Sequence, residues 1–129
     1  EMLNHKGTKE IRTSRLILRK YKISDAQDMF KNYASDERVT KFLNWRPYDN
    51  AEEILQFLEM SINDYKKENT YHWAIQFKGE IIGSIFAMFV NDLHKNCEVG
   101  YFSTDFYVSD INTILFSKKS SCIFTFFVL

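Results

Sequence analysis

The segment from Tyr71 to Tyr107 constrains the fold most, because its pattern predicts three consecutive β-strands. The expected ranges are Tyr71–Lys78, Glu80–Asp92 and Cys97–Phe102. Apolar and polar residues alternate through the first strand, which is typical of a half-buried strand. Ile81–Val90 is almost entirely apolar, so we expect the second strand to be covered on both faces. Gly100 lies inside the third strand, where a glycine often marks a bulge or the close approach of another molecule.

The residues before this antiparallel meander predict one more strand and several helices. Arg12–Tyr21 is the expected strand. Ser24 and Gln27 have the spacing of a capping box, which predicts a helix start at Ser24. Asn50 is a second expected N-cap and opens the longest predicted helix, Asn50–Glu68. The fold class expected from this order is α+β (mixed α/β), with a mostly antiparallel sheet flanked by helices.

The composition limits the classes of function. The chain has 129 residues, enough for one domain, and its 17 Lys and Arg balance 17 Asp and Glu. This balance gives no support for nucleic-acid binding, and no apolar run has the roughly 20 residues that span a membrane. The two cysteines, Cys97 and Cys122, lack the spacing of a metal site, and the histidines are scattered, so no metal is expected. Reduced thiols and a cytoplasmic location are the expectation.

Glu98 is the most informative ionisable residue, because it lies in the third predicted strand beside Gly100. A carboxylate partly buried there would have its pKa raised towards the range that suits a general base. The alternative is an exposed strand carboxylate or a simple ion pair. His72 is expected on the wetter face of its own strand.

Trp45, Tyr48 and Trp73 could line a pocket for a small molecule. Aromatic residues in such a pattern are more often part of the core, so core packing is the alternative interpretation. Familiar phosphate-binding, metalloprotease and hydrolase motifs do not occur in the chain.

The order of these elements resembles the GNAT superfamily of N-acyltransferases, in particular its RimJ/RimL-type branch. The resemblance covers Ile11 to about Tyr107. The segments that carry it are Thr13–Arg19 with Ser24–Ala26, Val39–Trp45, Lys78–Ile85 and Glu98–Tyr101. It implies the acyl-CoA N-acyltransferase fold, of which residues 11–107 would be the N-terminal portion, with a V-shaped sheet that splays beside the Gly100 strand.

The same resemblance implies an enzyme that transfers an acetyl group from acetyl-CoA to an amine. The pantetheine arm would pair with the backbone of the strand that contains Gly100, and Glu98 would take the amine proton. Trp45, Tyr48 and Trp73 would flank the acceptor, either a small-molecule amine or a protein N-terminus. The residues expected along the pantetheine arm are Val99, Gly100, Tyr101, Phe102 and Ser103.

The chain departs from the family after Tyr107. A glycine-rich loop at a helix N-terminus normally holds the CoA pyrophosphate there, yet no glycine follows Gly100 in this sequence. Residues 108–129 are therefore interpreted as an atypical tail, and a truncation or a frameshift in the gene is one hypothesis for it. Its Cys122–Leu129 run is apolar and β-prone, so we expect it to pack on the sheet or to exchange with a second copy in a homodimer.

An impaired acetyltransferase is the leading interpretation of the whole chain, and two alternatives stay open. One is a non-catalytic remnant or interaction module, in which the apolar run caps the Gly100 strand. The other is an unrelated small α+β binding domain. A sheet that does not splay beside Gly100 would favour the last of these.

Overall fold

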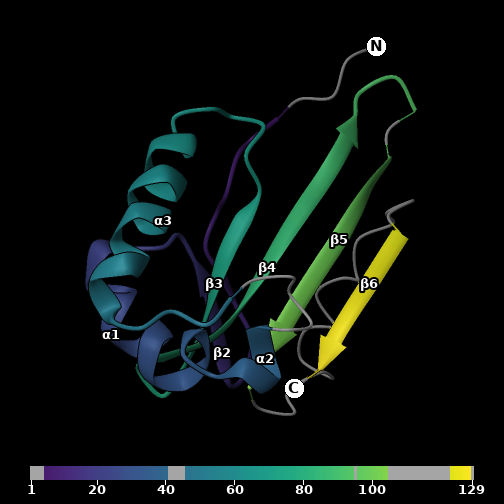
Figure 1. Cartoon of the computed structure of the whole chain (residues 1–129). Coiled ribbons are helices and arrows are strands. Elements are labelled where there is room, and N and C mark those ends of the chain that lie inside the picture. Colours follow the sequence, from purple (N-terminus) through teal and green to yellow (C-terminus); the bar gives the residue numbers. More distant parts are fainter. Residues whose placement is uncertain (1–4, 41–45, 95, 105–122, 129) are drawn as a thin grey trace.

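A single sheet organises the molecule. A computed structural model describes residues 5–40, 46–94, 96–104 and 123–128 of the chain. The sheet has six strands in the order of the sequence, and every neighbouring pair is antiparallel except the last, which is parallel. Figure 1 shows the strands side by side, from the N-terminal part to the yellow β6 at one edge. The strands are β1 (Ile11–Arg12), β2 (Leu16–Arg19), β3 (His72–Phe77), β4 (Glu80–Asn91), β5 (Asn96–Ser103) and β6 (Ile123–Val128).

The three-strand meander is confirmed as β3, β4 and β5. The single strand expected at Arg12–Tyr21 is instead divided into β1 and β2. The division occurs because the backbone turns at Thr13, whose amide donates to the carbonyl of Leu16 at 2.9 Å. Leu16 and Leu18 are both 1% exposed, so this face of β2 packs into the core.

Short helical segments and one longer helix cover one face of the sheet (Figure 1). They are the 3₁₀ turn η1 (Ile23–Asp25), α1 (Ala26–Met29), the π-helical turn η2 (Phe30–Ala34), α2 (Glu37–Thr40) and α3 (Ala51–Asp64). Asn50 caps α3 as predicted, because its side-chain oxygen accepts from the amide of Glu53 at 3.1 Å. None of the helices in the described ranges is long and apolar enough to cross a membrane.

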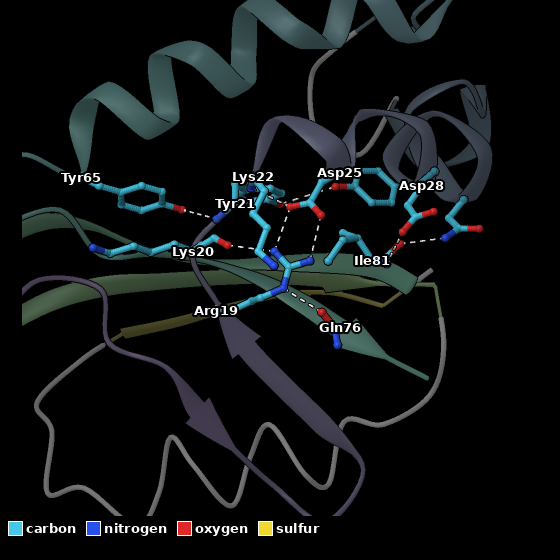
Figure 2. A network of polar contacts seen from close by, with 11 residues as sticks. Arg19, Lys20, Tyr21, Lys22, Asp25, Asp28, Tyr65, Gln76 and Ile81 are labelled. Atoms are coloured by element: carbon cyan, nitrogen blue, oxygen red, sulfur yellow. Dashed lines mark hydrogen bonds and ion pairs between the residues drawn. The ribbon is translucent and has the colours of Figure 1, made fainter. Parts of the chain in front are cut away.

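The expected cap at Ser24 is wrong, because a buried ion pair uses the neighbouring residue instead. The Asp25 carboxylate accepts from the amide of Lys22 at 2.8 Å and from the Arg19 guanidinium at 2.8 and 2.9 Å. Arg19 also donates to the Gln76 side chain at 2.7 Å. Figure 2 shows this network linking β2, η1 and β3. A paired carboxylate that is 4% exposed fixes the start of the helical region more firmly than an exposed serine would.

Two hydrophobic clusters lie on opposite faces of the sheet. The helix-side cluster is centred on Met29, Tyr33, Ile54, Leu58 and Phe102. The other, here called the far-side cluster, includes Leu16, Leu18, Ile75, Ile85 and Tyr101. Residues 81–85 contribute to both clusters, so the expectation that this part of the second predicted strand is covered on both faces is confirmed. The α+β class is confirmed by this arrangement of sheet and helices.

Candidate functional site

The candidate site is centred on β5, which lies between two other strands. On one side β5 pairs antiparallel with β4, with Gly100 opposite Phe86. On the other side it pairs parallel with β6 at six successive positions, from Glu98 to Ser103. The splay expected between these two strands is therefore absent along this stretch of the described chain. The apolar run at the end of the sequence pairs with the Gly100 strand within the same chain, as Figure 1 also shows.

A neighbouring aromatic ring lies close to Gly100. A Cβ atom built on Gly100 would lie 2.7 Å from two carbons at the far end of the Phe86 ring, Cε2 and Cζ. The ring therefore reaches across from β4 and fills the volume that a side chain at position 100 would take. Within the described structure, the close neighbour that we expected at this glycine belongs to the chain itself.

Glu98 lies on the helix-side face of the sheet and is half-buried. Side chains alternate along a strand, and Phe102, four residues later, belongs to the helix-side cluster. Glu98 is opposite Met88 on β4 and Ile123 on β6 in the pairing register. The role of Glu98 as a general base stays a prediction. The role of Val99–Ser103 along the pantetheine arm also stays a prediction.

The predicted aromatic pocket is divided between the two faces. Tyr48 packs against the helix-side cluster, and its amide donates to the carbonyl of Ala34 at 3.0 Å. Trp73 packs against the far-side cluster, and its indole N–H donates to the carbonyl of Lys9 at 2.7 Å. Trp45 lies outside the described residues. The structure does not bring Tyr48 and Trp73 together, and the role of all three beside an acceptor stays a prediction.

His72 was expected on the wetter face of its strand, and this is wrong. Its ring lies on the helix side, between Tyr21, Phe57 and Phe86, with centroid distances of 5.0, 5.9 and 6.1 Å. Nε2 is 2.9 Å from the hydroxyl of Ser84, which itself donates to a backbone carbonyl of β3 at 3.3 Å.

The electrostatic consequence is a neutral imidazole. Burial lowers the pKa of His72 to about 4, against the opposing attraction of the Asp64 carboxylate. Burial also raises the pKa of Tyr21 to about 12, so its phenol stays protonated at neutral pH. Sequence reasoning missed His72 because alternation along β3 does not say which face the helices cover.

Metal chemistry finds no support in the described ranges, where no three His, Cys, Asp or Glu residues gather in a way that could hold an ion. Cys97 is disulfide-bonded, which contradicts the expectation of reduced thiols. Periodicity and spacing carry no information about this bond. Most of the predicted tail, residues 105–122 and 129, lies outside the described residues.

Comparison with known proteins contradicts the reading as an unrelated α+β domain, which the absence of a splay beside Gly100 would have favoured. Residues 15–108 match the family model described as "Acetyltransferase (GNAT) domain". An "Uncharacterized N-acetyltransferase p20" from Bacillus licheniformis is 32% identical over 92 residues, which is 69% of this chain and 51% of the relative. The chain spans about half the length of the curated relatives it matches.

Two solved structures share the fold at low identity. The first is the RimL ribosomal L7/L12 alpha-N-protein acetyltransferase in complex with coenzyme A, with a TM-score of 0.68, 16% identity, and coverage of 84% of this chain and 66% of that chain. The second is the microcin C7 self-immunity acetyltransferase MccE in complex with acetyl-CoA and AMP, with a TM-score of 0.65, 17% identity, and coverage of 88% and 69%.

Proposed function

Because the chain belongs to the GNAT acetyltransferase family, we propose that its site is built to transfer an acetyl group from acetyl-CoA to a primary amine. The acceptor is a small-molecule amine or a protein N-terminus. We further propose that this chain performs the transfer weakly. The observation that carries the proposal is the family match across residues 15–108, which includes the whole of β5.

The proposed chemistry uses Glu98 and the backbone of β5. The amine nitrogen attacks the thioester carbonyl carbon, the C–S bond breaks, and coenzyme A leaves as the thiolate. Glu98 takes the proton from the amine, directly or through one water, and the thiolate is then protonated. The backbone from Val99 to Ser103 runs along the pantetheine arm. Glu98 is half-buried on the helix-side face, so the acceptor approaches from that face.

Two features of the chain support the weak binding. The first is that no glycine follows Gly100 to form a phosphate-binding loop. Each lost charge-assisted contact costs about 1.5–3 kcal/mol, so two lost contacts reduce the affinity by about 10²- to 10⁴-fold. The second is the pairing of β6 with β5 from Glu98 to Ser103. A pantetheine arm can use the same backbone groups only after this pairing opens.

Titration of the full chain with acetyl-CoA, followed by amide NMR, tests the proposal. We expect the amides of Val99–Ser103 to shift with a dissociation constant of about 1 mM, which is a loss of about 10³-fold from an intact site that binds at about 1 μM. Binding in the low micromolar range would contradict the impairment. No shift at 10 mM ligand (roughly ten times the expected constant) would contradict acetyl transfer itself.

A second candidate function is a non-catalytic interaction module, favoured by the six-position pairing between β5 and β6. In this case β6 is a permanent part of the sheet, and no thioester binds beside β5. A version in which copies exchange β6 requires a dimer, which sedimentation velocity detects as a mass that rises with concentration. A monomeric mass at every concentration counts against exchange.

A further inference from the structure

One row of residues crosses the sheet next to the proposed thioester site. His72 on β3 is opposite Phe86 on β4, and Phe86 is opposite Gly100 on β5. All three lie on the helix-side face, the face on which Glu98 also lies. The row is therefore on the side from which the acceptor approaches in the proposed reaction.

The proposed chemistry limits how far the thioester carbonyl lies from Glu98. When Glu98 takes the proton directly, the amine lies about 3 Å from its carboxylate and about 3–3.5 Å from the carbonyl carbon that it attacks. Residues two apart on a strand are separated by about 6.8 Å. That reach spans the distance from Glu98 to Gly100, and we place the carbonyl carbon beside Gly100 because the proposed path of the pantetheine arm runs along the backbone from Val99 to Ser103.

At that level the helix-side surface is formed by the Phe86 ring. The far end of the ring, Cε2 and Cζ, is only 2.7 Å from where a Gly100 Cβ would be. The Phe86 side chain is half-buried, so part of it faces outward. A group bound beside Gly100 meets this ring before it meets any deeper part of the core.

The ring is supported from behind. His72 packs edge-on against Phe86 at 6.1 Å, with an angle of 87° between the ring planes. His72 is held in turn by Ser84 at 2.9 Å and by the Tyr21 ring at 5.0 Å. Phe86 therefore cannot turn towards β3 without displacing a hydrogen-bonded, packed imidazole.

We propose that Phe86 determines acyl specificity by limiting the length of the acyl group beside Gly100. The ring would then stop an acyl chain longer than acetyl, such as butyryl, from extending beside Gly100. This inference rests on the proposed acetyl transfer. It assigns to Phe86 a role that β-strand periodicity alone does not suggest.

The test compares acetyl-CoA with butyryl-CoA in NMR titrations of the full-length chain. In the unchanged chain we expect butyryl-CoA to bind at least about 10-fold more weakly than acetyl-CoA, since small apolar differences in a closed pocket are worth about that factor or more. Phe86→Ala should bring the two affinities within about 3-fold, and Phe86→Leu should fall between. The leucine variant keeps an apolar side chain and guards against misfolding of the alanine variant.

Phe77→Ala is the matched control. Phe77 is also a half-buried phenylalanine of the β3–β4 hairpin, but it lies at the opposite end, beside Glu80. Its removal should leave the ratio of the two affinities unchanged. If both thioesters bind and neither Phe86 variant changes their ratio, the inference is wrong while acetyl transfer stands. If neither thioester shifts the β5 amides in any variant, the limit on acyl length and the proposed acetyl transfer are both overturned.

Discussion

Protonation of His72 should destabilise the fold in mildly acidic solution. An unfolded histidine has a pKa near 6.5, and burial lowers the pKa of His72 to about 4 in the folded chain. Between these two values the unfolded chain binds a proton that the folded chain does not bind. The stability contributed by neutral His72 is therefore complete above pH 6.5 and is lost as the pH falls towards 4.

The magnitude follows from the difference between the two pKa values. A difference of about 2.5 corresponds to about 3.4 kcal/mol, of which about 2.4 kcal/mol is lost between pH 7.0 and 4.5. Part of the His72 side chain keeps contact with solvent, so we expect a loss of about 2 kcal/mol in the free energy of unfolding.

The assay is urea unfolding at the two pH values for the unchanged chain and for His72→Gln. Glutamine keeps a polar group that can form a hydrogen bond with the Ser84 hydroxyl but does not titrate. Carboxylates that titrate in the same range contribute equally to both chains and cancel in the comparison. The reasoning is refuted if the two chains lose the same stability between pH 7.0 and 4.5.

Three further predictions follow from the sheet and its buried ion pair. Gly83→Ala should lower the free energy of unfolding by about 3 kcal/mol in urea, because its Cβ would collide with the backbone oxygen of Phe102 on β5; a loss below about 1 kcal/mol would contradict this. Arg19→Leu should lower the free energy of unfolding by about 3–5 kcal/mol, because it leaves the Asp25 carboxylate buried without its partner. The double variant Arg19→Leu/Asp25→Leu should recover part of that loss. The double variant Phe124→Pro/Thr125→Pro should bind acetyl-CoA about 10-fold more tightly than the control Phe124→Val/Thr125→Val. Successive backbone amides point to opposite edges of a strand, so one of the two prolines removes an N–H donor that faces β5. Equal dissociation constants for the two double variants would show that β6 does not compete.

The fold was predictable where local pattern and tertiary packing agree. Alternation in β3, the apolar run in β4 and the Asn50 cap are short-range signals that the finished structure keeps. Ser24 failed as a cap because a long-range partner, Arg19 on β2, holds the adjacent Asp25. A capping pattern considers only residues close in the sequence, but the residue that holds the Asp25 carboxylate lies on a separate strand.

The candidate site was less predictable, because a site depends on which face of a strand is covered. Tyr48 and Trp73 are both aromatic and half-buried, yet they pack on opposite faces of the sheet. Period-two alternation assigns residues of one strand to two faces but does not identify the face that carries the helices. For the same reason His72 was placed on the wrong face, although its strand was identified correctly.

Gly83 and Gly100 show how the same sequence signal can have two physical causes. A Cβ at Gly83 would collide with the backbone of β5, which cannot move without breaking the sheet, so the fold alone requires that glycine. A Cβ at Gly100 would meet only the far end of the Phe86 ring, which a twist of about 30° away from its rotamer can move at a cost of about 1 kcal/mol. Stability therefore constrains Gly100 more weakly than Gly83. If Gly100→Ala costs little stability but changes the ratio of butyryl-CoA to acetyl-CoA affinity, the glycine serves the position of the Phe86 ring and not the integrity of the sheet.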